Sequence, residues 1–318
     1  MALRTAQARA GEAGFRPRRP GIFEREDTLG YLLLVPTVFM LVTFLAFPFV
    51  YGAVLSLTST EVGDPSLGGF VGFANYVFEA ARDGVFRLSF INTFAYTFFT
   101  TIVKFLLGLA MALLLNQSFP GQRFTRAALL LPWIIPSVLS TLAWRWMFDP
   151  TFSVINWVMN AGLHAPFCHG ATTCINWLGT PRTAMISMMI VNIWRGTPFY
   201  GIAFLAGLQT IPVELYEAAR VDGASRWKQF LHITIPMLRP VLLVVLLLST
   251  ILTFADFQLP WVLTRGAPYN SSQVLATWAY TIAIPGNQLS IGAAVSLFLF
   301  PVLTIVIAGV LLILRRPE

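Results

Sequence analysis

The sequence has 318 residues, of which 56% are hydrophobic and only 11% are charged. A soluble domain would carry about 25% charged residues, so this composition excludes an ordinary soluble protein and predicts an all-α membrane protein with several spans. The apolar runs are continuous rather than alternating, which argues against a membrane β-barrel. The net charge of +7 comes from basic residues spread between apolar runs, where they set topology rather than bind nucleic acid.

The first 28 residues form a polar tail that contains six arginines. Pro17, Pro20 and Gly21 argue against a packed unit, so we expect a disordered cytoplasmic tail over residues 1–28. The apolar stretch that follows is too long for a signal peptide and has no obvious cleavage site. We therefore expect it to be the first membrane span.

Six apolar spans are predicted after the tail. They cover about residues 29–57, 88–115, 127–147, 183–208, 241–263 and 289–314. Lys104 lies in the second span, where its side chain either faces a polar interior or partner, or snorkels to the interface. Arg195 and Asp256 lie in the fourth and fifth spans, where a charge is costly, so they should face the protein interior or pair.

An even number of spans places both termini on the same side of the membrane. That side carries fourteen of the Lys and Arg residues in the loops and tails, against five on the other side. The excess of positive charge predicts that both termini and the loop between the fourth and fifth spans are cytoplasmic. The loop with Cys168 and Cys174 then lies outside, where an oxidising compartment permits a disulfide between them; free thiols are the alternative.

The longest polar interval in the second half is 217–240, which reads EAARVDGASRWKQFLHITIPMLRP. A helix should begin near Pro212, with Glu214 and Glu217 at its positive end, and Asp222-Gly223 is a turn signal. A second amphipathic piece over 224–233 is expected to end before Pro236 and Pro240. Physical chemistry alone is equally compatible with an amphipathic helix on the membrane surface.

The spacing of this interval resembles the cytoplasmic EAA loop of ABC importer permeases. The match comprises E-A-A, two residues, D-G-A, and then Phe230, Ile233 and the two prolines. Further matches follow in order and include Asn92-Thr93, Leu131-Pro132, WRGTPF at 194–199, LAGLQTIP at 205–212 and FADFQLPWVLTRGAP at 254–268. The resemblance covers nearly all the chain after the tail. It is closest to carbohydrate-type permeases, the group that includes the first membrane subunit of maltose and glycerol-3-phosphate importers.

This resemblance implies a type I ABC importer permease fold of about six transmembrane helices over 29–318, with the coupling helix inside 212–240. It implies contact with an ATPase at Glu217, Ala218, Asp222, Gly223 and Ala224. A weaker implication concerns the substrate pathway, which would include Asn192, Arg195, Gly196, Phe199, Ser249, Thr253 and Asp256. An ion pair between Arg195 and Asp256 that only holds the spans together is the alternative. The chain departs from the family pattern at Gln258, where an acidic residue is common, and at Arg265.

The resemblance further implies a permease subunit of the bacterial inner membrane that moves a sugar or sugar-like solute, such as an oligosaccharide, glycoside or polyol. Its expected partners are a second related permease in a heterodimer, two ABC ATPases and an extracytoplasmic solute-binding protein. The sequence lacks a GxxxxGK[ST] phosphate loop, so ATP and Mg are expected on the ATPase, with no cofactor and no metal site on this chain.

Two other classes of function are alternatives to an importer subunit. A membrane enzyme would need a nucleophile–base pair or a set of metal ligands, and neither pattern occurs in the sequence. A self-sufficient secondary transporter could use Lys104, Arg195 and Asp256 for ion coupling. However, no inverted repeat relates the two halves, and the EAA loop would then have no explanation.

Overall fold

The computed structural model describes residues 26–64, 67–164 and 174–314. Most of these residues are helical, and the described part of the chain has no β-strand beyond an isolated bridge between Thr58 and Phe70, which confirms the predicted all-α class. Cys168 and residues 1–25 of the predicted tail lie outside the described residues. The disulfide and the disordered tail therefore stay predictions. The chain divides into two compact units, residues 1–52 and 53–318.

The first unit is a nearly continuous apolar helix. It comprises α1 (Glu26–Leu41), the π-helical turn η2 (Val42–Ala46) and most of α2 (Phe47–Leu55). Residues 30–55 carry no charge and are long and apolar enough to cross a membrane. Pro36 and Pro48 lie inside helical segments, as membrane helices allow. The first predicted span is thus present, and its helix begins at Glu26, inside the predicted tail.

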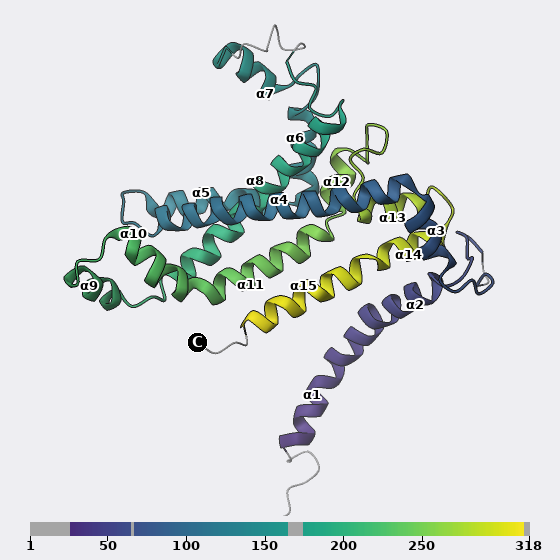
Figure 1. Cartoon of the computed structure of the whole chain (residues 1–318), viewed down its shortest axis with the longest axis horizontal. Coiled ribbons are helices and arrows are strands. Elements are labelled where there is room, and N and C mark those ends of the chain that lie inside the picture. Colours follow the sequence, from purple (N-terminus) through teal and green to yellow (C-terminus); the bar gives the residue numbers. More distant parts are fainter. Residues whose placement is uncertain (1–25, 65–66, 165–173, 315–318) are drawn as a thin grey trace, which may run out of the picture. The chain divides into compact units, whose positions relative to one another are not determined.

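The second unit holds the other helices, which are labelled in Figure 1. They are α3 (Ala74–Arg82), α4 (Gly84–Leu115), α5 (Gln122–Ile134), α6 (Ser137–Met147), α7 (Val154–Trp157), η3 (Val158–Gly162), α8 (Pro181–Leu208), α9 (Val213–Val221), α10 (Arg226–Gln229), η4 (Phe230–Thr234), α11 (Ile235–Phe254), α12 (Gln258–Leu263), α13 (Leu275–Ala283), α14 (Leu289–Leu297) and α15 (Leu299–Leu314).

Length and apolar composition identify four helical spans in the described residues, or five if a bent pair counts as one span. The bent pair is α5 and α6, which meet at 90°. Pro132 lies inside α5, and Pro136 precedes α6, so two prolines flank the bend. The fourth predicted span corresponds to α8, which is 28 residues long but is not among these spans.

The prediction that the piece 224–233 ends before Pro236 and Pro240 is wrong. Helical residues continue from Arg226 to Phe254 through the π-helical turn η4. In that turn the N–H of Ile235 bonds five residues back to Phe230, so the helix is widened directly before Pro236. Pro236 and Pro240 both lie in α11, as membrane-spanning helices allow.

The fifth predicted span, 241–263, is also shifted. α11 begins at Ile235, ends at Phe254 and is followed by a break before α12 begins at Gln258. Asp256 therefore lies between two helices rather than inside one. One of its carboxylate oxygens accepts the backbone N–H of Leu259, 3.3 Å away, which helps α12 to begin there.

Close contact between α4 and α8 forms the centre of the second unit, with α11 packed against both (Figure 1). The contact depends on glycine, because a Cβ atom at Gly108 would lie 2.3 Å from the Cβ of Tyr200. Tyr200 and Phe204 are fully buried beside it. Small residues let membrane helices approach closely, so Gly108 sets the spacing of α4, which carries Lys104, and α8, which carries Asn192.

We expect Gly108→Ala to destabilise the protein by about 1–3 kcal/mol, because the added methyl group must push α4 away from α8. The melting temperature of the purified chain in mild detergent measures this effect. Gly84→Ala is the matched control on the same helix, since nothing lies within 4 Å of a Cβ built there. Equal melting temperatures for the two variants would contradict the close-packing role.

A pair of carboxyl groups lies where α3 meets α4 and α13. Asp83 accepts the N–H of Val85 at the start of α4 and the indole N–H of Trp278, each at 2.8 Å. Glu79 is 2% exposed, and its Oε2 atom has no hydrogen-bond partner among the described residues. Burial, together with the negative charge of Asp83, raises the pKa of Glu79 to about 7.

This pKa predicts that stability falls as pH rises. Glu79 ionises near its ordinary pKa of 4.5 in the unfolded chain but only near 7 in the folded chain, so the folded state holds more protons between these values. The melting temperature should therefore decrease from about pH 5 to about pH 7 and then level off. Glu79→Gln should flatten this decrease, whereas Glu214→Gln, at an exposed carboxylate, should leave it unchanged. A profile that Glu79→Gln leaves unaltered would disprove the assignment.

Candidate functional site

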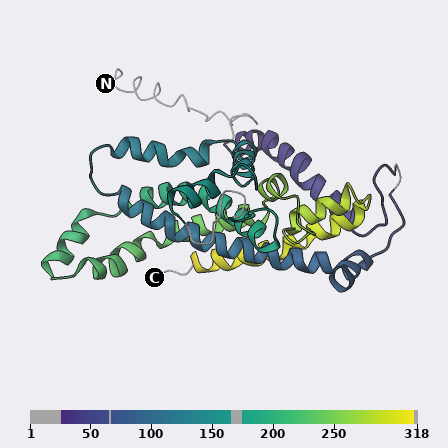
Figure 2. The ribbon, with the colours of Figure 1, turned by 90° about the horizontal axis from the view of Figure 1, so that it is seen from above.

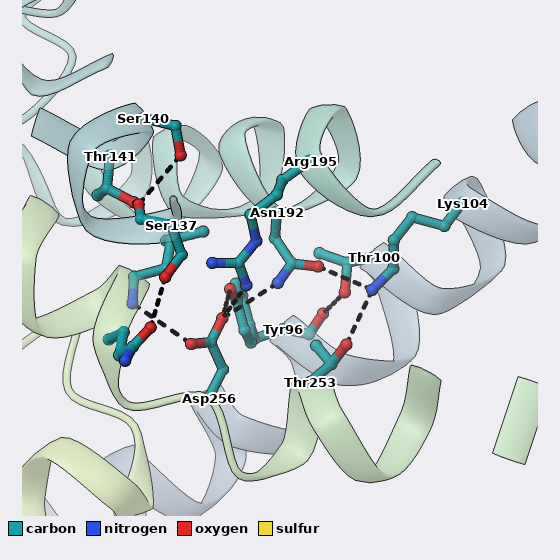
Figure 3. Close-up of polar contacts among 12 residues, drawn as sticks. Tyr96, Thr100, Lys104, Ser137, Ser140, Thr141, Asn192, Arg195, Thr253 and Asp256 are labelled. Atoms are coloured by element: carbon teal, nitrogen blue, oxygen red, sulfur yellow. Dashed lines mark hydrogen bonds and ion pairs between the residues drawn. The ribbon is translucent and has the colours of Figure 1, made fainter. Parts of the chain in front are cut away.

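Asp256 is the centre of a buried polar cluster, shown in Figure 3. Its Oδ2 atom accepts hydrogen bonds from Tyr96 on α4 at 3.3 Å and from Asn192 on α8 at 3.3 Å. It also forms an ion pair with Arg195, one turn further along α8, at 3.1 Å. The helix break at Asp256 thus turns one carboxylate toward two neighbouring helices. The structure pairs the two charges that the sequence predicted to face the interior or each other.

Lys104 belongs to the same cluster. Its Nζ donates to Oδ1 of Asn192 and to Oγ1 of Thr253, both at 2.8 Å, and the residue is 2% exposed. The sequence allowed the Lys104 side chain either to face a polar interior or to snorkel to the membrane interface. The structure supports the polar interior. The lysine connects α4 to both α8 and α11, as Figure 3 shows.

A cavity of about 380 Å³ borders this cluster, within the range of small-molecule sites. Six of the seven predicted pathway residues line it, namely Asn192, Arg195, Gly196, Phe199, Ser249 and Thr253. The seventh, Asp256, is joined to the cavity wall through its ion pair with Arg195. The structure therefore brings together all the residues proposed for the substrate pathway.

Several cavity residues were missed by the sequence analysis. Trp133, Ile134, Ile135, Pro136 and Ser137 come from the bend between α5 and α6, and Gln258 comes from the start of α12. Ser137 donates a hydrogen bond to Gln258, and both residues line the cavity. The prolines of the third span were a signal that its helix could bend. No sequence pattern indicated that the bend would meet α8.

The cavity is lined by both aromatic and polar side chains. The rings of Trp133 and Phe199 stack with their centroids 5.0 Å apart and their planes inclined by 20°. The cavity lining also includes the donors and acceptors of Lys104, Asn192 and Thr253. Such a combination suits a ligand with an apolar ring face and polar substituents. Aromatic side chains bury the apolar face of such a ligand, and a few polar side chains fix the orientation of the ligand.

The predicted coupling residues form a second, separate group in the hairpin of α9 and α10. Figures 1 and 2 both show this hairpin at the end of the second unit opposite α13 and α14. Glu217, Ala218, Asp222 and Gly223 are exposed, and Ala224 is half-buried. Gly223 turns the chain with φ +76°, and Ser225 then caps α10 by accepting the N–H of Lys228.

The hairpin also exposes large apolar side chains. Val221 is 88% exposed and Trp227 is 67% exposed, with the indole stacked on Phe230 at 5.5 Å. These side chains adjoin the acidic and small residues of the turn. Apolar surface of this kind beside a polar turn is typical of a contact with another protein or with a membrane.

The chain is similar to known transport proteins. The family described as "Binding-protein-dependent transport system inner membrane component" matches residues 104–316. The trehalose/maltose transport system permease protein MalF of Thermococcus litoralis is 35% identical over 277 residues, which cover 87% of this chain and 90% of that protein. The sulfoquinovosyl glycerol transport system permease protein SmoG of Agrobacterium fabrum is 34% identical over 294 residues, 91% of each chain.

A solved structure has the same fold. It is the crystal structure of a bacterial alginate ABC transporter in complex with an alginate pentasaccharide-bound periplasmic protein. A chain of that complex superposes with a TM-score of 0.78 over 91% of this chain and 95% of its own length, at 22% sequence identity. The fold of the chain is therefore that of a type I ABC importer permease.

Proposed function

Because this chain belongs to the inner membrane components of binding-protein-dependent transport systems, we propose that it moves a sugar or sugar-like solute as the permease subunit of an ATP-driven ABC importer. It is a multi-pass membrane protein and a transport component rather than an enzyme. The solutes named for its relatives, trehalose or maltose and sulfoquinovosyl glycerol, support an oligosaccharide, glycoside or polyol as cargo.

The observation that carries this proposal is the cavity beside Asp256. Six of the seven residues that the family resemblance assigns to the substrate pathway line one cavity, which holds both aromatic rings and hydrogen-bonding groups. Sugars bind through the same two kinds of contact. The cavity would hold the solute between α8 and α11 while it crosses the membrane.

The hairpin of α9 and α10 would couple transport to ATP hydrolysis. Glu217 and Asp222 supply negative charge, Ala218 and Ala224 permit close approach, and Gly223 allows the sharp turn. The exposed Val221 and Trp227 give an ATPase apolar surface to cover. Closure of the ATPases would move this rigid element and tilt the helices attached to it. ATP and Mg would bind to the ATPase, and this chain would need no cofactor.

The remaining partners follow from the family. A second related permease would complete the pore as a heterodimer, two ABC ATPases would bind below it, and a solute-binding protein would deliver the solute from outside. The alginate transporter, whose fold this chain shares, was crystallised with its periplasmic protein, which supports the last of these. We propose the bacterial inner membrane as the location, with both termini in the cytoplasm, because the cytoplasmic loops then carry most of the basic residues.

Affinity purification of the chain from its native membrane in mild detergent, with mass spectrometry of the proteins that accompany it, tests the proposal. We expect an ATPase and a second EAA-containing permease, with a binding protein after gentle crosslinking. Recovery of this chain alone, repeated under crosslinking, would contradict the proposal. It would favour a self-sufficient secondary transporter that uses Lys104, Arg195 and Asp256.

A further inference from the structure

The charges around the cavity do not balance. Two basic residues, Lys104 and Arg195, line it, and no acidic residue is among the lining residues. Asp256 is the one carboxylate in ion-pair contact with them in the described part of the chain, and it contacts Arg195 at 3.1 Å. In its ammonium form Lys104 therefore has neutral oxygens as hydrogen-bond partners and no counter-ion of its own.

Lys104 also has hydrogen-bonding capacity to spare. An ammonium group has three N–H donors, and two of them reach Asn192 and Thr253. Among the described residues these are its two acceptors, so one N–H is left to face the cavity that the lysine lines. A charged group inside a membrane that lacks an ion-pair partner is costly, which makes this donor a strong attractor for a negative group.

The fold makes room for the lysine at this place. A Cβ atom at Gly196 would lie 2.5 Å from Cδ of Lys104, so the glycine leaves space on α8 for the lysine stem. The next residue of the pathway face, Phe199, stacks on Trp133, and both rings line the cavity. A ligand whose ring lies against Trp133 and Phe199 would thus lie in the same cavity as the basic side chains.

We propose, on the basis of the importer function above, that the solute moved through this cavity is an anionic saccharide whose carboxylate or sulfonate group binds beside Lys104 and Arg195. The acidic group supplies the counter-ion that Lys104 lacks, and the sugar ring lies against Trp133 and Phe199. Charge-assisted hydrogen bonds are stronger than those between neutral groups, so we expect a preference of about tenfold or more over a neutral sugar.

The test compares two matched pairs of probes on the purified full chain in lipid nanodiscs. D-glucuronate is compared with D-glucose and D-galacturonate with D-galactose, so each pair differs in a carboxylate in place of a hydroxymethyl group. Ligand-observed NMR titration gives the dissociation constants. We expect at least one uronate to bind about tenfold more tightly than its neutral partner, with the difference decreasing in high salt.

The variants then assign the preference to one side chain. The sequence has two lysines, Lys104 and the exposed Lys228, which form a matched pair. Lys104→Met should remove the preference and Lys228→Met should keep it, while Lys104→Arg, which retains the charge, should keep most of it. A lysine that only connects helices would change the melting temperature and leave the ratio of uronate to neutral sugar unaltered.

Two results would overturn the proposal. One is a wild-type chain that binds neither uronate more tightly than its neutral partner, and the other is a preference that survives Lys104→Met. If either result is obtained while the ATPase and second permease still copurify with the chain, the proposal of an anionic solute is wrong. The assignment of the chain as a permease subunit then still holds. Lys104-dependent uronate binding by a chain that copurifies with no ATPase would instead overturn the importer assignment alone.

Discussion

Gly223→Pro is expected to abolish solute uptake while the chain still accumulates in the membrane. Gly223 has φ +76°, and its N–H donates to the carbonyl of Arg220 at 3.1 Å. Proline fixes φ near −65° and has no N–H, so it cannot form this turn. Nothing lies within 4 Å of a Cβ built at Gly223, so the effect comes from the backbone alone. The angle between α9 and α10 must change, and the proposed ATPase contact is lost with it.

Gly121 provides the matched control for this variant. It has φ +81° at the start of α5, and a Cβ built there also meets nothing within 4 Å. It lies in another loop predicted to be cytoplasmic, outside the proposed coupling residues. Gly121→Pro should therefore carry a similar local strain of about 1–3 kcal/mol and leave most of the uptake.

Uptake of the solute by whole cells, normalised to the amount of chain in the membrane, measures the difference between the two proline variants. ATPase activity of the purified complex gives a second readout, since an uncoupled complex should no longer respond to the loaded binding protein. Normal uptake by Gly223→Pro, or an equal loss in Gly121→Pro, would refute the coupling role of the α9–α10 turn.

The turn at Gly223 could be predicted from sequence because its cause is local. A positive φ is tolerated by glycine and strained in most other residues, so Asp222-Gly223 signals a turn without reference to the rest of the fold. The substrate-pathway residues of α8 could also be predicted from the sequence. Asn192, Arg195, Gly196 and Phe199 follow helical spacing and therefore share one face. Their convergence on one cavity agrees with the role that the family resemblance implied.

The environment of Lys104 could not be predicted because it depends on residues far away in the sequence. Gly196 provides the space for its stem, and Asn192 and Thr253 provide its acceptors. The break at Asp256 has the same origin. In sequence it lies within an apolar stretch, and the interactions that hold it between α11 and α12 come from α4 and α8.

Asp256→Ala is expected to cause the largest loss of stability of any single change in the polar cluster. The variant removes the acceptor for Tyr96, Asn192 and Arg195 together with the cap on Leu259. The Arg195 side chain is 21% exposed and would be left without its carboxylate. Removing one partner of a buried ion pair costs about 3 kcal/mol or more, so the melting temperature of the purified chain should fall sharply and uptake should be lost.

The double variant Arg195→Met, Asp256→Ala separates a structural ion pair from a role in solute passage. Removing both charges leaves neither member of the ion pair without its partner, whereas the hydrogen bonds of Tyr96 and Asn192 to Asp256 stay lost. We therefore expect the double variant to recover the part of the stability that the unpaired Arg195 costs in Asp256→Ala. Uptake should stay low, because both residues belong to the proposed pathway and Arg195 lines the cavity. Recovery of stability together with normal uptake would mean that the pair only holds α8 to the α11–α12 break. Failure to recover stability would place the main contribution of Asp256 in its contacts with Tyr96 and Asn192 instead of the ion pair.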